Sequence, residues 1–245
     1  EYVAAPDAKT FDEYNAACGN AIKIITLAPE TDGALDFIRH IVAQGTVVSV
    51  GHTGAKYAEV KAAMEAGATN VTHTYNAQSP LHHREIGVVG SALLLEDLYC
   101  ELICDTIHVS VPAMQLLVKN KRADKLALIT DAMRAAGTNE THSILGGRVG
   151  GVPVVVKDGV AQLPDFSFYA GSIGTMDRAL RVAHVEYGIP LLDVSRMLSL
   201  TPARLMHVDA RKGSLEPGKD ADIVIMNGEF AVENVFVRGR SCLSE

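Results

Sequence analysis

The sequence has no excess of positive charge. Its 22 lysines and arginines are outnumbered by 29 acidic residues, which gives a net charge of −7. Nucleic-acid-binding domains carry a basic surface, so this balance argues against a nucleic-acid partner. A small anionic substrate stays open, because a few arginine and histidine side chains are enough to bind one anion.

Long apolar runs are also missing. The longest, such as VGGVPVVV and IKIITLA, fall far short of the ~20 residues that a membrane-spanning helix needs. The first residues do not form the charged-then-apolar pattern of a signal peptide. We therefore expect no membrane association.

The cysteines show no paired spacing. Cys100 and Cys104 fall on one predicted strand, about 13 Å apart at the usual rise per residue, which is too far for a disulfide. The other two are Cys18 and Cys242. We expect four buried, reduced thiols and a cytoplasmic protein.

The residues that are present give an ordinary globular balance, 48% hydrophobic and 21% charged. From about residue 20, short β-branched runs alternate with amphipathic helical stretches, and five strands precede residue 131. Short links between alternating strands and helices predict parallel strands with crossover helices, an α/β fold. Both faces of such a sheet are covered, which agrees with the almost continuous runs of apolar residues in these strands.

The pattern changes after residue 131. ILGGRVGGVPVVVKDGVAQL is rich in glycine and β-branched residues and predicts a β-hairpin insertion near 144–163. Two helical stretches follow, and the tail contains strands and turns. We expect a (β/α) barrel domain over 1–208 and the strands of a small β module over 209–245.

Several predicted strands end in a side chain that can do chemistry. VVSVGH ends at His52, NVTH at His73 and LALITD at Asp131. Active sites of α/β barrels lie at the carboxyl ends of the strands, and histidine with carboxylate suits a divalent metal. One strand-end histidine alone is more often a hydrogen-bonded core residue. For Glu30 and Asp105 we favour structural roles at the start of a helix.

The loop after His73 is unusually polar, because two histidines and Arg84 follow Pro80. Such a run is commonly a solvated loop. The functional alternative is an anion site in which Arg84 makes paired hydrogen bonds to a phosphate or carboxylate. The residues alone leave both interpretations open.

Six segments resemble, in order, the motifs of N-acetylglucosamine-6-phosphate deacetylases of the metal-dependent amidohydrolase superfamily. They are GHTGA, THTYNAQSPLHHREIG, ICDTIHV, LITDAMRAAG, YAGSIGTMDRALR and GSLEPGKDADIVI. The resemblance implies a (β/α)8 TIM-type barrel with a small β-sandwich. It also implies hydrolysis of N-acetylglucosamine 6-phosphate to glucosamine 6-phosphate and acetate.

The same resemblance implies residue roles. His52 and His73 correspond to metal ligands, and Asp131 to the catalytic acid and base. The positions implied to contact the substrate are Asn76, Ala77, Arg84, His108, Tyr169, Ala170 and Gly171. The arginine can come from a neighbouring subunit, so a homodimer is implied. Zinc is the first candidate for the metal, with iron or another divalent ion as the alternative.

The chain departs from the family pattern at its start. A Leu-Glu-Gly-Pro segment, whose glutamate is a further metal ligand, has no counterpart, and five strands stand where a closed barrel has eight. We therefore expect the C-terminal part of a longer chain. Two alternatives remain: another amidohydrolase, acting on a cyclic amide or a different amino sugar, and an inactive truncated domain that serves as a binding partner.

Overall fold

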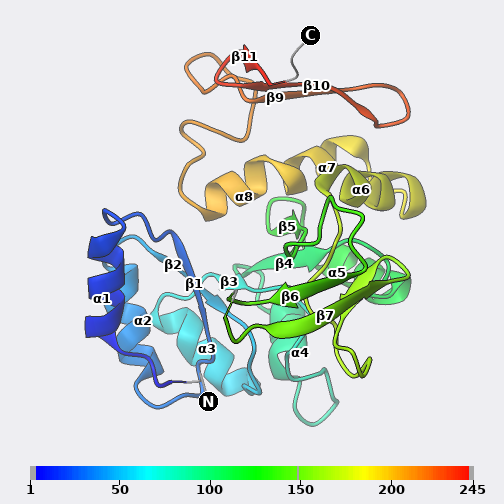
Figure 1. Cartoon of the computed structure of the whole chain (residues 1–245). Coiled ribbons are helices and arrows are strands. Elements are labelled where there is room, and N and C mark those ends of the chain that lie inside the picture. The colour runs from blue at the N-terminus through cyan, green and yellow to red at the C-terminus, as the bar shows by residue number, and fades with distance from the viewer. Residues whose placement is uncertain (1–3, 148, 243–245) are drawn as a thin grey trace.

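The computed structural model describes residues 4–147 and 149–242, and its centre is one parallel sheet. The strand order is β1-β2-β3-β4-β5, and every neighbouring pair is parallel. The predicted series of five parallel strands is thereby confirmed (Figure 1). The strands are β1 Ile24–Leu27, β2 Val47–Val50, β3 Asn70–Val71, β4 Tyr99–Ile103 and β5 Leu126–Ile129.

Helices connect these strands and continue beyond them. The helix over Tyr57–Ala66 ends at Gly67, whose φ of 118° lies in the left-handed region that favours glycine. A π-helical turn, η1 Val182–Glu186, follows α6 directly. The α-helices are α1 Ala8–Ala17, α2 Ala34–Val42, α3 Tyr57–Ala66, α4 Gly87–Leu94, α5 Val111–Asn120, α6 Met176–Arg181, α7 Leu191–Leu198 and α8 Leu200–Leu205.

The main core lies between the sheet and the helices that cover its outer face. Val48 and Leu128 point outward from β2 and β5, and they belong to one buried cluster with helix residues such as Ile38, Leu117 and Met197. Burial of these side chains is the main favourable contribution to the folding of this layer. The helices therefore hold the strands, and with them the strand ends, in a fixed arrangement.

Leu117 provides a test of this core. Its side chain is fully buried, whereas its neighbour Leu116 on α5 is 45% exposed. We expect Leu117→Ala to lower the free energy of unfolding by about 2–5 kcal/mol, because it removes buried methyl groups and leaves a cavity. Denaturant unfolding of the full-length protein measures this. Leu116→Ala is the matched control, with an expected change within about 0.5 kcal/mol; equal losses in the two variants would contradict this core assignment.

The inner face of the sheet is polar. Successive residues of a strand point to opposite faces, and the residues opposite the core-facing ones are Thr26, Ser49, Asn70 and Glu101. Hydrogen bonds join Asn70 Nδ2 to Ser49 Oγ (2.9 Å) and to Glu101 Oε1 (2.7 Å). The expectation of apolar residues on both faces is therefore wrong for the inner face of β1 to β4, whereas β5, with the sequence LALI, is apolar throughout.

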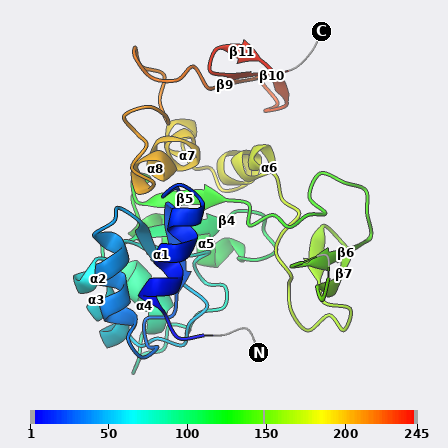
Figure 2. The ribbon, with the colours of Figure 1, turned by 60° about the vertical axis from the view of Figure 1, so that its left-hand side comes forward.

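A small antiparallel sheet follows the parallel one, in the order β6-β7-β8. Its strands are β6 His142–Leu145, β7 Val152–Lys157 and β8 Val160–Gln162. Figure 2 shows the β6–β7 hairpin standing away from the main sheet. Val154 and Ala161 pack in a separate buried cluster with Met133, Ala135 and Ala170. These hairpins occupy the segment that the glycine-rich sequence indicated.

The tail forms a third sheet in the order β11-β10-β9. Its strands are β9 Ile223–Met226, β10 Val232–Val237 and β11 Arg240–Ser241, and both pairings are antiparallel. It lies beyond α7 and α8 from the main sheet (Figure 1). Among the described helices, none has the length and apolar character required to cross a membrane.

The prediction for the cysteines is partly wrong. All four are free, but only Cys100 and Cys104 are buried, whereas Cys18 and Cys242 are exposed. Burial raises the pKa of Cys100 to about 11 and that of Cys104 to about 12. Cys18 directly follows α1, and Cys242 lies beyond β11. Cys18 and Cys242 are exposed because the ends of α1 and β11 lie at the surface, and the apolar character of a thiol is too weak to predict burial there.

Candidate functional site

Two histidines meet where β2 and β3 end. His52 lies two residues beyond β2, and His73 lies two residues beyond β3. Their Nε2 atoms are 2.9 Å apart, and the ring planes are inclined at 71° with centroids 4.7 Å apart. The two imidazoles thus direct the same nitrogen towards a common point.

The backbone at the strand ends is strained. His52, His73 and Asp131 have φ values of 49°, 28° and 49°, in the left-handed region that residues other than glycine seldom adopt. Such conformations persist only where the surroundings enforce them, and they concentrate at functional sites. All three strand-end residues that the sequence indicated share this feature, which turns their side chains out of the regular alternation of the strands.

The electrostatics favour a neutral imidazole at His52. Burial, and secondarily the neighbouring His73, lower the pKa of His52, whereas the nearby Asp131 carboxylate opposes this shift. A histidine must be neutral to ligate a metal, so the shift favours the ligating form. The Nδ1 atom of His73 is buried and has no hydrogen-bond partner among the described residues.

The two histidines fit a divalent metal ion as part of its ligand set. Two imidazole nitrogens on a tetrahedral zinc ion lie about 3.3 Å apart, close to the separation found here. Over residues 4–147 and 149–242, no group of three or more histidine, cysteine, aspartate or glutamate side chains is arranged to hold a metal. The described residues therefore offer two nitrogen donors that fit a metal, and no complete ligand set.

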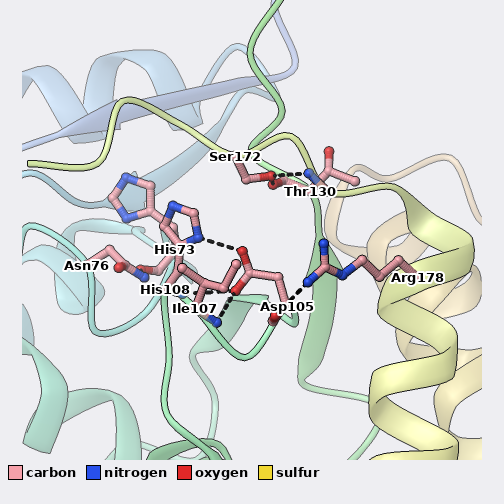
Figure 3. A network of polar contacts seen from close by, with 9 residues as sticks. His73, Asn76, Asp105, Ile107, His108, Thr130, Ser172 and Arg178 are labelled. Carbon is pink, nitrogen blue, oxygen red and sulfur yellow. Dashed lines mark hydrogen bonds and ion pairs between the residues drawn. The ribbon is translucent and has the colours of Figure 1, made fainter. Parts of the chain in front are cut away.

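A second cluster forms beyond β4, around Asp105. Its carboxylate accepts hydrogen bonds from the backbone N–H groups of Ile107 and His108 (2.9 Å each) and lies 2.6 Å from His108 Nδ1. Figure 3 shows this pair, with Arg178 donating to the Asp105 carbonyl. Burial opposes ionisation, yet these hydrogen bonds lower the pKa of Asp105. His108 Nε2 is buried and without a partner among the described residues.

The segment Tyr169–Gly171 runs along the end of β5. The backbone N–H of Ser172 donates to the Asp131 carbonyl at 2.8 Å, and the Ser172 hydroxyl donates to the Thr130 carbonyl (Figure 3). The Tyr169 ring lies against His108, with centroids 5.0 Å apart. The predicted substrate segment thus contacts His108 through Tyr169 and is followed directly by Ser172, which binds the Asp131 backbone.

Asn76 and Ala77 lie in the turn after His73. Asn76 Nδ2 donates to the His73 carbonyl at 3.2 Å, and the Ala77 carbonyl accepts from Thr53 N at 3.1 Å. Ala77 also has a positive φ, 47°. These contacts fix the turn beside the two histidines.

Arg84 is placed differently. It lies exposed in the loop after Pro80, where its backbone N–H donates to His82 Nδ1 at 3.3 Å. No contact within the described part of the chain joins its guanidinium to the histidine pair. The structure therefore brings together the predicted residues on the sheet edge but leaves Arg84 outside that group.

Glu30 has a structural role, but it stabilises a different segment from the helix start that was predicted. Its carboxylate accepts hydrogen bonds from Gly54 N (2.9 Å) and from the Thr53 hydroxyl, in the loop after His52. The next helix along the chain, α2, instead begins after Gly33. Glu30 thus holds the loop of the neighbouring unit, which the linear sequence does not reveal.

One polar residue of the site was not predicted. Glu101 lies in the middle of β4, and its Oε2 accepts the backbone N–H of His73 at 3.3 Å. Burial raises the pKa of Glu101, and the nearby Asp131 charge adds to this shift. Because successive strand residues point to opposite faces, the segment CELI predicts that Glu101 lies on the face opposite Cys100 and Leu102. A charged residue on an otherwise apolar strand was the signal that could have identified it.

Residues 6–242 match the family model described as "Amidohydrolase family". The chain belongs to this family. Amidohydrolases generally depend on divalent metal ions, and the paired histidines agree with that property. The parallel sheet of this amidohydrolase, with its helices, matches the TIM-barrel fold of the family.

This amidohydrolase is similar to sugar-phosphate deacetylases. It is 38% identical to N-acetylglucosamine-6-phosphate deacetylase from Bacillus subtilis (strain 168), over 98% of the chain and 59% of the relative. It is 36% identical to N-acetylgalactosamine-6-phosphate deacetylase from Escherichia coli O157:H7, over 94% and 59%. The chain therefore spans about three-fifths of the length of these relatives.

A solved structure shows the same likeness. An N-acetyl-D-glucosamine-6-phosphate deacetylase mutant from Mycobacterium smegmatis, in complex with N-acetyl-D-glucosamine-6-phosphate, superposes with a TM-score of 0.90 at 32% identity. The superposition covers 98% of this amidohydrolase and 62% of that protein. The resemblance drawn from the motifs is thus confirmed over nearly the whole chain.

Proposed function

We propose that the full-length protein hydrolyses the acetamide group of N-acetylglucosamine 6-phosphate, which gives glucosamine 6-phosphate and acetate. The observation that carries this proposal is the convergence of His52 and His73, with the Asp131 carboxylate near enough to act on the pKa of His52. The similarity to deacetylases that carry this substrate in their names supports it.

The strand-end residues divide the chemistry between them. His52 and His73 would hold a divalent cation through their Nε2 atoms. When bound, such a cation polarises the amide carbonyl and makes water more acidic. Asp131 takes a proton from the attacking water and returns it to the amine nitrogen as the C–N bond breaks, which balances the proton over the reaction. The products are acetate and the free amino sugar.

The remaining polar groups bind the sugar phosphate. His108 presents its unpartnered Nε2 to the substrate, and Asp105 fixes the orientation of that ring through Nδ1. Asn76 and the backbone of Ala77 contact the sugar, and the segment Tyr169–Gly171 lies along its other side. Arg84 binds the phosphate, and its exposed position fits a site completed by a second subunit.

The finer properties are proposals of the same kind. We infer that the metal is zinc and that the protein is a homodimer. The four free cysteines support a reducing compartment, the cytoplasm. We also propose that 1–208 forms the barrel portion, with an insertion near 144–163, and that 209–245 contributes to a small β module.

A second candidate substrate is N-acetylgalactosamine 6-phosphate. The similarity to a deacetylase named for that sugar, at 36% identity, favours this alternative specifically. Both reactions use the same hydrolytic chemistry, so the strand-end residues do not separate them. The difference lies in the configuration of one hydroxyl group.

Acetate release measures this proposal directly. The full-length, metal-loaded protein is assayed with both phosphorylated sugars and with N-acetylglucosamine. We expect the highest kcat/KM with N-acetylglucosamine 6-phosphate. Faster turnover of the galactose epimer would favour the second candidate, and no acetate from any of the three would refute the deacetylase proposal.

Arg84→Ala tests the phosphate contact. A hydrogen-bonded charge contributes about 1.5–3 kcal/mol, so kcat/KM for the phosphorylated sugar should fall about 10- to 150-fold. The rate with N-acetylglucosamine should stay nearly constant, because it lacks the phosphate. Arg39→Ala, at an exposed arginine paired with Asp36, is the control. Equal losses on both sugars would contradict a phosphate contact.

A further inference from the structure

Glu101 contacts the turn that carries His73 in two ways. Its backbone carbonyl accepts Thr74 N at 2.8 Å, and its side-chain Oε2 accepts His73 N at 3.3 Å. The preceding amide, Thr72 N, donates to the Val50 carbonyl on β2 at 3.0 Å. The backbone N–H groups of residues 72, 73 and 74 thus all donate to β2 or β4, the two strands on either side of β3. The N–H of His73 is the one whose acceptor is a side chain, that of Glu101.

The same carboxylate ends a chain of polar groups across the inner face. Glu101 Oε1 accepts from Asn70, which in turn donates to Ser49. Ser49 Oγ and Thr26 Oγ1 both contact the Thr72 hydroxyl. Each strand from β1 to β4 contributes one member, and Glu101 is the only member with an ionisable side chain. The side chain of Glu101 is therefore held through Oε1, the oxygen that does not accept from His73 N.

We propose that Glu101 is a positioning residue for the metal site, holding His73 in the backbone conformation that directs its Nε2 towards His52. This inference rests on the proposed metal-dependent function. Beyond Val71 the regular ladder of β3 stops, and a φ of 28° at His73 is unfavourable without an external constraint. The carboxylate of Glu101 supplies that constraint at the amide of His73 itself.

Glu101→Leu tests the proposal, because it removes both oxygen acceptors at similar side-chain volume. Residues that orient a metal ligand typically change metal affinity about 10- to 100-fold when replaced. We expect zinc affinity, measured by competition with a chromophoric chelator, to fall within that range. Glu59→Leu is the matched control, since the Glu59 carboxylate likewise accepts a backbone N–H, from Lys56 at 2.7 Å, in the first turn of α3 rather than at the turn that carries His73.

Glu101→Gln separates positioning from charge. Asn70 Oδ1 has no partner among the described residues, so its amide can turn over, and glutamine can still accept from His73 N. We expect zinc affinity within about threefold of the unmodified protein. A loss as large as that of Glu101→Leu would overturn the positioning role in favour of a charge effect.

Hydrogen exchange supplies a measurement that needs no variant. The amide of His73 should be protected in the metal-free protein although it lies beyond the end of β3. Rapid exchange at His73, or unchanged zinc affinity in folded Glu101→Leu, would overturn the proposal. If the unmodified protein bound no zinc or other divalent metal at all, the proposed function itself would fail, which is a distinct result.

Discussion

Asp131→Asn is expected to reduce kcat for acetate release by about 10²–10⁴-fold in the full-length protein, with little change in KM. A positioned acid or base contributes a factor of this size, and asparagine neither accepts the proton from water nor delivers it to the amine. Asparagine also tolerates the left-handed backbone at Asp131, where φ is 49°. Steady-state kinetics at saturating metal measure the effect.

Asp158→Asn is the matched control for that experiment. Asp158 has a similar φ of 52° but lies in the turn between β7 and β8. The control should retain the original kcat, because the same chemical change occurs outside the site. An Asp131→Asn variant with at least one-third of the original kcat would remove Asp131 from the proton transfers.

His73→Asn should weaken metal binding by at least about 100-fold. Loss of a ligand is more severe than loss of a group that merely orients one, for which 10- to 100-fold is typical. The asparagine side chain is too short to place a donor atom where His73 Nε2 now lies, next to His52. Metal content after dialysis against a buffered metal solution, determined by elemental analysis, measures the loss.

His207 offers the matched histidine. Its φ of 55° resembles that of His73, yet it follows α8 in an exposed position. His207→Asn should keep the original ratio of metal to protein. If His73→Asn kept that ratio as well, the two-histidine site would be refuted, even though the fold and the family would stand.

The strand ends could be predicted because two simple regularities act on them. Alternation of strand and helix locates the sheet, and the carboxyl ends of parallel strands share one edge, so His52, His73 and Asp131 were expected to converge. The distances between these three side chains depend on the backbone dihedral angles at the end of each strand. The sequence pattern does not specify those angles. The strand expected to end at His73, over NVTH, is only Asn70–Val71, because the chain leaves the regular strand pairing before His73.

Other features had weaker signals. The helix α4 carries no amphipathic pattern by which the sequence could locate it, because almost every position in GVVGSALL is apolar or glycine. Glu101 was overlooked because one charge within a short apolar strand gives little contrast unless the two faces are considered separately. The location of Arg84 depends on how the loop leaves the sheet, and it is not determined by any local pattern.

The left-handed backbone at the strand ends limits how this protein can diverge. Glycine adopts such a conformation without strain, and asparagine, aspartate and histidine adopt it at a lower cost than valine, isoleucine and threonine. In a saturation library selected only for folding, positions 52, 73 and 131 should therefore be enriched in that small set, even without selection for activity. The geometry of the chain would then preserve candidate ligand residues in descendants that have lost the reaction.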